Sequence, residues 1–394
     1  MDALARLLNT TKEDKTEKGF LYTPAEIAQQ PATWPRTFEI FRKRRAELRE
    51  FLSGAGFNFT AATQPTLVLV GAGTSDYIGK SVVRLLRRQW NCDAMACPST
   101  DLITQMEEIL RPDRRYLCLS FSRSGDSSEG VAVLERILAR RPDIHHLVVS
   151  CNRDGKMIKI AQGSNRAFGI CLDDAVNDRG LAMTSSYSNM VVLGQALAHI
   201  ETPEEYSGIL QKLIDAAKTF VPRAADFAAD LAQRRFKKAC FVGTGTLRAV
   251  AQESALKLLE MTAGRILTMS ESALGLRHGP MAALDHDTLF VSFLSGDERI
   301  RRLEENLLRE IGGKKLVRTR IAVTANSRAA MDGRVDDYLF PEAPAEVGDD
   351  HRAPVDVIFG QLLGLFSSLA CGLKPDAPSP SGAIGRVVQN LDLH

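Results

Sequence analysis

Short apolar runs alternate with longer amphipathic segments along the chain from about residue 65. The first runs are rich in Val, Ile and Leu and nearly uninterrupted, which is typical of strands buried on both faces. Segments with the period of a helix follow them. The pattern therefore predicts a parallel sheet covered by helices on both sides, with strands at 66–70, 116–121, 145–151 and 168–172.

A second series of strands and helices begins near residue 236. It shares landmarks with the first, because VGAGT at 70–74 matches VGTGT at 242–246 and SGD at 124–126 matches SGD at 295–297. The two offsets, 172 and 171 residues, are nearly equal, which indicates a duplicated unit. The predicted fold class is α/β, with two tandem doubly wound parallel-sheet domains of the flavodoxin-like, three-layer kind.

The N-terminal region is predicted to be a helical extension. Thr23 and Pro24 form a helix start signal, because proline suits the first helical turn. We expect the amphipathic helices that follow to be broken at Pro31 and Pro35, where the ring removes a backbone donor.

Charge gives no reason to expect nucleic acid or an anionic membrane as a partner, because 50 Lys and Arg against 48 Asp and Glu leave a net charge of +2. The basic run RKRR at 42–45 could form a nucleic-acid patch, but Phe38, Phe41 and Leu48 keep a helical stripe that favours a solvated helix face. No run of apolar residues approaches the 18 of a transmembrane helix, and the N-terminus lacks a signal-type apolar core. Seven scattered cysteines without a metal or redox spacing suit a reducing compartment, so the chain is predicted to be cytoplasmic.

The first glycine turn, VGAGTS, follows a predicted strand and precedes a helix. At the carboxyl end of a parallel strand, free N–H groups and the helix dipole favour an anion. A dinucleotide fingerprint is the alternative, but its third glycine would stand where Asp76 is found, and a carboxylate would repel a pyrophosphate. Thr74 and Ser75 are therefore candidates for binding a phosphate monoester.

The turn after the next strand is rich in hydroxyl groups and contains an arginine. Hydroxyls, turn amides and one guanidinium can hold a phosphate without a large basic patch. The predicted phosphate ligands in this turn are Ser122, Arg123, Ser124 and Ser127.

The duplicate half is an internal comparison for this prediction. Leu247 replaces Ser75 there, and Glu298 replaces Ser127. These replacements remove hydroxyls and add an anion, so we expect one phosphate site per chain, in the first half.

The motifs GTS at 73–75 and SRSGDS at 122–127 resemble those of the sugar isomerase (SIS) domain. Residues 45–375 resemble the two tandem SIS units in the isomerase portion of glucosamine-6-phosphate synthase. The segments 350–389, LAMTSSYSNM and ESALGLRHGP are similar to the tagatose-6-phosphate ketose/aldose isomerase family, whose members include galactosamine-6-phosphate deaminase/isomerases. The resemblance covers nearly the whole chain.

Glu253, Lys257 and Glu260 share one face of a predicted helix in the second half. The pattern leaves two interpretations open: a solvated face with a Glu–Lys pair, or a partly enclosed site in which a carboxylate is tuned for proton transfer. The resemblance favours the second. It implies that Glu260 is the base for proton transfer between C1 and C2 of the sugar, with Lys257 beside it.

Among the histidines, His278 lies in a loop bounded by Gly and Pro. A single histidine is usually structural, but the resemblance implies that this one opens the sugar ring and is supplied by the neighbouring subunit. His145 and His146, beside a strand, are expected to be ordinary surface residues, and His351 has no assigned role.

The resemblance also concerns the tail and one helix start. Arg386 stands about where the synthase has an imine-forming lysine, and arginine stays protonated, so a mechanism that adds ammonia is disfavoured. By the resemblance Arg386 is expected to bind the sugar. Thr184 and Ser185 could bind sugar hydroxyls or, equally well, cap a helix.

The resemblance implies an amino-sugar phosphate deaminase/isomerase that converts galactosamine 6-phosphate and water into tagatose 6-phosphate and ammonia. The alternatives are an aldose–ketose isomerase of a hexose 6-phosphate, a glucosamine-6-phosphate deaminase, or a non-catalytic phosphosugar sensor. No metal or other cofactor is expected, and the assembly is expected to be a homodimer or a dimer of dimers with active sites at the subunit interface. The predicted parts are an N-terminal helical extension, a phosphate-binding SIS domain, an SIS domain with the acid–base residues, and a tail over the active site: 1–45, 46–205, 206–375 and 376–394.

Overall fold

The computed structural model describes residues 1–59, 63–325, 335–339 and 347–388. Two compact units are present. We call them the first-sheet unit (residues 32–178, 185–208 and 385–394) and the second-sheet unit (residues 1–31, 179–184 and 209–384). The domain boundaries drawn from the sequence stay a prediction.

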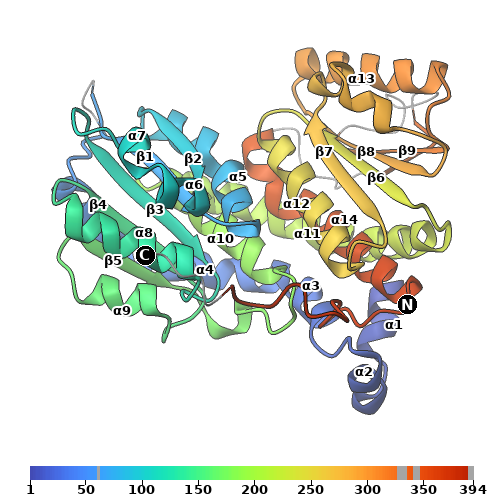
Figure 1. Ribbon diagram of the computed structural model, residues 1–394, viewed down its shortest axis with the longest axis horizontal. Helices are drawn as coiled ribbons and strands as arrows, with labels where there is room; N and C mark the ends of the chain where they lie inside the picture. The colour runs from blue at the N-terminus through green and yellow to red at the C-terminus, as the bar shows by residue number, and fades with distance from the viewer. Residues whose placement is uncertain (60–62, 326–334, 340–346, 389–394) are drawn as a thin grey trace. The chain divides into compact units, whose positions relative to one another are not determined.

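The first-sheet unit contains a five-stranded, wholly parallel sheet with the order β2-β1-β3-β4-β5 (Figure 1). The strand order reverses between β1 and β3, so the carboxyl ends of these two neighbours form the switch point at which ligands bind in such sheets. The strands are β1 Thr66–Gly71, β2 Ala94–Pro98, β3 Tyr116–Ser122, β4 His145–Ser150 and β5 Ala167–Cys171.

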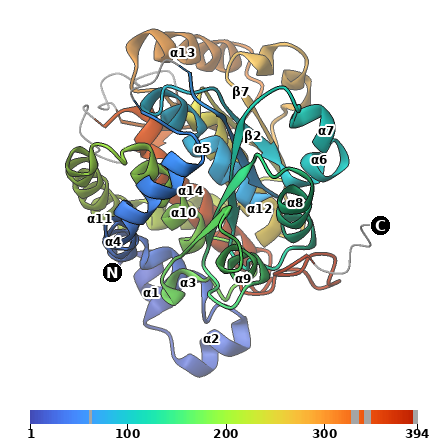
Figure 2. The same ribbon diagram turned by 90° about the vertical axis from the view of Figure 1, so that its left-hand side faces the viewer.

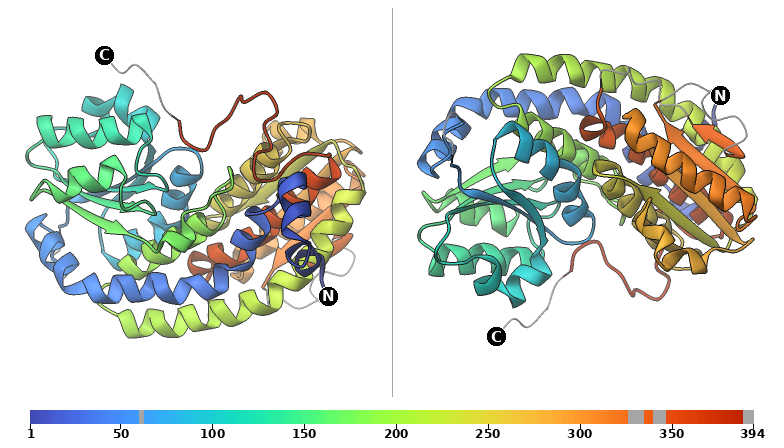
Figure 3. Two further views of the ribbon diagram at one scale, coloured as in Figure 1. Left: turned by 90° about the horizontal axis from the view of Figure 1, so that it is seen from below. Right: turned by 90° about the horizontal axis from the view of Figure 1, so that it is seen from above.

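Helices cover both faces of this sheet (Figures 2 and 3). On one face α5 contacts β1 and β2 and packs against α10. On the other, Val133 and Ile137 of α8 join Val68 and Cys118 of the sheet in one fully buried cluster. The helices of the unit are α4 Gln30–Gly54, α5 Thr74–Gln89, α6 Ser99–Thr104, α7 Met106–Ile109, α8 Ser128–Arg140, α9 Lys156–Gln162 and α10 Ser185–Ala198, with a 3₁₀ turn, η1, at Asp174–Val176.

The second-sheet unit contains another five-stranded parallel sheet, with the order β10-β9-β8-β6-β7. Counted from β6, this is the connection order of the first sheet, as expected of a duplication. Its strands are β6 Lys238–Gly243, β7 Leu267–Ser272, β8 Thr288–Leu294, β9 Thr319–Thr324 and β10 Asp337–Leu339.

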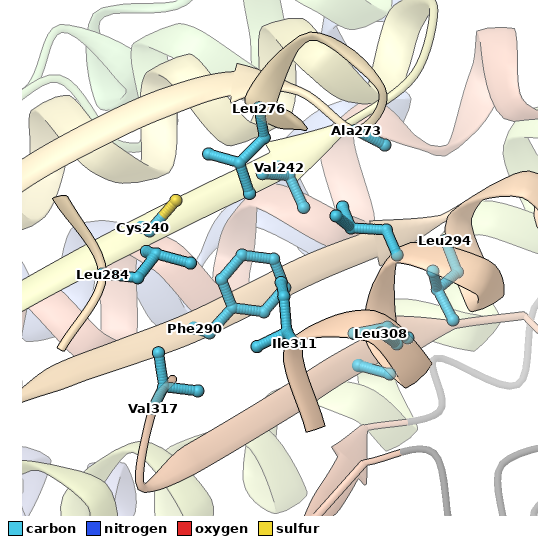
Figure 4. Packing of buried hydrophobic residues seen from close by; sticks show 12 residues of the cluster. Cys240, Val242, Ala273, Leu276, Leu284, Phe290, Leu294, Leu308, Ile311 and Val317 are labelled. Carbon is cyan, nitrogen blue, oxygen red and sulfur yellow. The ribbon is translucent and has the colours of Figure 1, made fainter. Parts of the chain in front are cut away.

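One face of the second sheet is covered by α13, whose Leu308 and Ile311 pack on Phe290 of β8 (Figure 4). The other face is covered by α12, against which α14 packs. The remaining elements include three short N-terminal helices and the long α11. The helices are α1 Ala3–Leu8, α2 Lys12–Lys18, α3 Thr23–Ala28, α11 Pro203–Gln233, α12 Thr246–Met261, α13 Glu298–Gly313 and α14 Asp349–Ala370, with 3₁₀ turns η2 Gly275–Arg277 and η3 Pro280–Ala283.

The packing of α14 on α12 depends on two glycines. A Cβ atom on Gly360 would collide with the side chain of Ser254, and one on Gly364 would press on Met261 and the backbone of Lys257. The two helices therefore approach more closely than larger side chains would allow. By length and composition α14 could also cross a membrane, but 89% of its most apolar window is buried inside the protein, as in a core helix.

The predicted fold class, two parallel α/β sheets with N-terminal helices, is confirmed. Two local predictions are wrong. A helix break does fall near Pro31, since α3 ends at Ala28 and α4 begins at Gln30, but α4 runs unbroken past Pro35, whose ring removes only one hydrogen bond. His146 is fully buried on β4, where its Nε2 lies 2.7 Å from Ser120 Oγ and burial lowers its pKa to about 3.

Candidate functional site

The turn from β1 to α5 is built on two glycines. A Cβ atom on Gly71 would collide with the carbonyl group of Ser75, so the strand can approach the helix only with glycine here. Gly73, at φ 56°, precedes the first residue of the helix, and open space surrounds its Cβ position. Thr74 and Ser75 form the first turn of α5 and are nearly buried. Open space thus lies beside Gly73 at the N-terminus of α5, where the helix dipole favours an anion.

The loop from β3 to α8 folds around its own hydroxyl groups. The N–H of Gly125 donates to Ser122 Oγ at 3.0 Å, and the N–H of Asp126 donates to Ser124 Oγ at 3.1 Å. Gly125 has a positive φ of 67°, which glycine adopts without strain. Ser127 is the N-cap residue of α8 but its side chain makes no capping bond. These serine hydroxyls and the turn from β1 meet at the switch point because β1 and β3 are neighbours. We call the two loops together the first cradle.

The tail of the chain lies against this loop. Arg123 is 5% exposed, and its guanidinium donates to the carbonyl oxygen of Arg386 at 2.5 Å. The N–H of Ser128 donates to the carbonyl oxygen of Val388 at 3.4 Å. The Arg386 side chain donates in turn to the carbonyl oxygen of Asp178 at 2.8 and 2.6 Å. The backbone of the tail thus takes two donors that an anion in the first cradle could use.

The start of α10 is capped by a residue that the sequence did not single out. The Asp178 carboxylate accepts from the N–H groups of Ser185 at 3.1 Å and Ser186 at 2.9 Å. Ser185 and Thr184 are fully buried. The carboxylate of Asp178, rather than the hydroxyls of the predicted segment, therefore satisfies the helix terminus.

The acid–base helix α12 brings two of the predicted groups into direct contact. Lys257 Nζ lies 2.6 Å from Glu260 Oε2 and 3.4 Å from Glu253 Oε1. The side chains of Glu253 and Lys257 are fully buried, whereas 23% of the Glu260 side chain is exposed. The solvated-face interpretation is therefore wrong for Glu253 and Lys257, and only Glu260 keeps access to solvent.

The charge of Lys257 is held by its two neighbours. Burial alone lowers the pKa of Lys257, but Glu253 and Glu260 more than offset this, so the pKa is raised above its ordinary value. The ammonium group therefore remains charged near neutral pH and orients the carboxylate of Glu260 by a charge-assisted hydrogen bond.

His278 lies in the loop between η2 and η3 and is exposed. The backbone N–H of His278 donates to the carbonyl oxygen of Gly275 at 3.0 Å, and the next residue, Gly279, has a φ of 124°. Arg277 Nε pairs with Glu310 Oε2 at 2.8 Å, which ties the loop to α13. His278 thus lies in the second-sheet unit, on a loop that the Arg277–Glu310 ion pair ties to α13, and its side chain faces outward.

A duplicated doubly wound sheet with a hydroxyl-lined cradle at its switch point defines a protein of the sugar isomerase (SIS) class. No model of a protein family matches the sequence. A relative from Streptomyces coelicolor, provisionally named D-galactosamine-6-phosphate deaminase AgaS, is 37% identical over 95% of both chains. The D-galactosamine-6-phosphate deaminase AgaS of Escherichia coli is 32% identical, again over 95% of both chains. The chain belongs to the AgaS family.

A solved structure supports this assignment. A protein from Clostridium novyi, provisionally described as a tagatose-6-phosphate ketose/aldose isomerase, matches with a TM-score of 0.92 and 28% identity over 98% of both chains. The family resemblance predicted from the sequence motifs is thereby confirmed.

Proposed function

We propose that the protein is a deaminase/isomerase of an amino-hexose 6-phosphate, most specifically of galactosamine 6-phosphate. The observation that carries the proposal is the contact of buried, charged Lys257 with the partly exposed carboxylate of Glu260 at 2.6 Å. A carboxylate held in this way can accept a proton from carbon and return it to the next carbon. The names of the relatives from Streptomyces and Escherichia coli support the choice of substrate.

In this proposal the first cradle binds the phosphate. Its ligands are the hydroxyls of the loop serines, the N-terminal turn of α5 and the Arg123 guanidinium, which would exchange the tail carbonyl for a phosphate oxygen. The assigned residues are Thr74, Ser75, Ser122, Arg123, Ser124 and Ser127. Thr184, Ser185 and Arg386 are assigned to the sugar by family resemblance alone.

Ser124→Ala is expected to weaken binding of inorganic phosphate about 10-fold, because one net hydrogen bond to a charged group contributes about 1.5 kcal/mol. The matched control is Ser164→Ala. Ser164 Oγ likewise accepts a backbone N–H, from Arg166, but it lies before β5, at the opposite end of the sheet. Titration calorimetry with phosphate measures both variants. Equal binding by Ser124→Ala and the control would remove this hydroxyl from the site.

The reaction follows from the properties of an open-chain 2-amino aldose. His278 would transfer the proton that opens the ring. Glu260 would then remove the proton from C2 and deliver it to C1, while the aldehyde oxygen gains a proton, leaving an imine at C2. Water adds to this imine, and the C–N bond breaks to give the ketose and ammonia. Lys257 stays charged, so its part is to orient Glu260 rather than to form an imine itself.

Aldose–ketose isomerisation without deamination is the second candidate, favoured by the name given to the structural relative from Clostridium novyi. It uses the same base and differs only in the substituent at C2.

A screen for ammonia release across galactosamine, glucosamine and mannosamine 6-phosphates is expected to give the largest signal with galactosamine 6-phosphate. The coupled measurement is ammonia and ketose 6-phosphate in equal amounts. The opposite result would be tagatose 6-phosphate formed from galactose 6-phosphate, with no ammonia released from any of the three amino sugars. That result would support the isomerase and defeat the deaminase.

The compartment and assembly belong to the same proposal. All seven cysteines are free thiols, which suits a reducing cytoplasm. The outward-facing His278 suits a homodimer or a dimer of dimers in which each subunit supplies this residue to its neighbour.

A further inference from the structure

The second-sheet unit retains the backbone of a phosphate cradle. Its two loops follow β6 and β8, which are neighbours at the switch point of the second sheet. Gly245 precedes α12 with φ 61° and ψ −126°, nearly the values of Gly73, 56° and −125°. Ser295 Oγ accepts from the N–H of Asp297 at 3.0 Å, as Ser124 Oγ does from Asp126. We call these two loops the second cradle.

The donors of the second cradle are taken by two carboxylates at the start of α14. Thr246 Oγ1 donates to Asp350 Oδ1 at 2.6 Å. Ser295 Oγ donates to Asp349 Oδ2 at 2.5 Å, and the N–H of Gly296 donates to Asp349 Oδ1 at 2.9 Å. Hydroxyls from both loops and a turn amide thus converge on these carboxylates, as they would on a phosphate.

A guanidinium completes the arrangement. Arg352 is fully buried, and its Nη1 donates to Asp349 Oδ1 at 3.2 Å while Nη2 donates to Asp356 Oδ2 at 2.7 Å. The first cradle likewise combines hydroxyls with one nearly buried arginine, Arg123. Two carboxylates carry the same charge as a phosphate monoester near neutral pH, about −2.

One replacement between the halves explains why an amide is available to Asp349. In the first cradle the N–H of Gly125 is bonded to Ser122 Oγ. Phe293 stands at the equivalent position of the second cradle and offers no acceptor, so the N–H of Gly296 turns to the carboxylate instead.

We propose that Asp349 and Asp350 are a built-in anion that occupies the phosphate position of the second cradle. The chain therefore has two cradles of common origin, one open to a phosphate monoester and one filled by its own side chains. The built-in anion also fixes the start of α14 to the loops after β6 and β8. Because α14 packs on α12, the same contacts hold the helix that carries Lys257 and Glu260.

The test is the number of phosphate ions bound per chain, with inorganic phosphate as the probe. The double variant Asp349→Ala, Asp350→Ala is expected to bind one phosphate more than the unaltered protein in titration calorimetry. Adding Ser295→Ala is expected to remove the extra ion. A double variant that keeps its far-ultraviolet circular dichroism and binds no extra ion would overturn the proposal.

Two controls separate this result from other causes. Asp215→Ala with Asp230→Ala changes the net charge equally on exposed positions of α11, and a similar gain there would show non-specific attraction and defeat the proposal. If the variant at 349 and 350 is unstable, its melting temperature is expected to rise with phosphate more than that of the unaltered protein, and an equal rise would contradict the proposal. The comparison counts the difference of one ion, so it stands even if the first cradle proves not to bind phosphate.

Discussion

The Glu260→Gln variant is expected to lose turnover by about 10²- to 10⁴-fold, the usual contribution of a general base. Glutamine keeps an oxygen that can accept from Lys257 Nζ, so the helix should retain its packing. The phosphate-binding residues are untouched, and binding of galactosamine 6-phosphate should change little. The measurements are the kcat for ammonia release and the Kd of the sugar phosphate from calorimetry.

Glu47→Gln is the control, because Glu47 is exposed on α4 and pairs only with Arg44 among the contacts described here. It should leave both quantities unchanged. Unaltered turnover in Glu260→Gln would remove this carboxylate from the mechanism. If neither the variant nor the parent releases ammonia, but both bind the sugar phosphate tightly, the protein is a phosphosugar sensor.

The Lys257→Met variant is expected to lower the free energy of unfolding by about 3–5 kcal/mol, because removing one partner of a buried ion pair leaves the other charge uncompensated. The side chain of Glu253 is fully buried beside Lys257 and cannot turn to water. Urea denaturation measures the loss. Because the pKa of Lys257 is raised, its contribution is present in full below the ordinary lysine pKa and is lost as the pH rises through the raised value. The difference should therefore persist across the neutral range and shrink only in strongly alkaline solution.

Two comparisons test this cause. Lys218→Met removes an exposed lysine on α11 that pairs with Asp215 and should cost less than about 1 kcal/mol. Combining Lys257→Met with Glu253→Gln should restore part of the lost stability, because the buried carboxylate is neutralised. If Lys257→Met alone lowers the free energy of unfolding by less than about 1 kcal/mol, the charges of Glu253, Lys257 and Glu260 do not stabilise this part of the protein.

The strands that the sequence predicted include every inner strand of the first sheet, where continuous apolar runs are required on both faces, and one edge strand, β5. The missed strands β2, β7 and β10 all lie at sheet edges. Met95 of β2 is 40% exposed and Leu267 of β7 is 63% exposed. An edge strand has fewer neighbours to bury it, so its composition resembles that of a loop and its periodicity is weak.

Some features of the candidate site are set by adjacent residues and could be predicted, whereas others depend on residues far along the chain. The turns at Gly73 and Gly125 were predictable because their backbone conformation is set by adjacent residues. The enclosure of Lys257 was not, since it depends on Gly360 and Gly364, which lie about a hundred positions further along the chain. The carboxylate of Asp349 contacts Ser295, which lies 54 positions earlier in the sequence, and no local sequence pattern predicts such a contact.

The close approach of strand and helix at Gly71 recurs at Gly243, where a Cβ atom would collide with the carbonyl group of Leu247. Glycine is required at these positions by the packing of the strand against the helix, whatever the neighbouring hydroxyl groups bind. Divergence after duplication could therefore exchange the chemistry of one copy, from soluble ligand to tethered carboxylates, without disturbing its architecture. Glycine spacing alone thus marks where a ligand could sit in such repeats, while the side chains that follow decide whether one does.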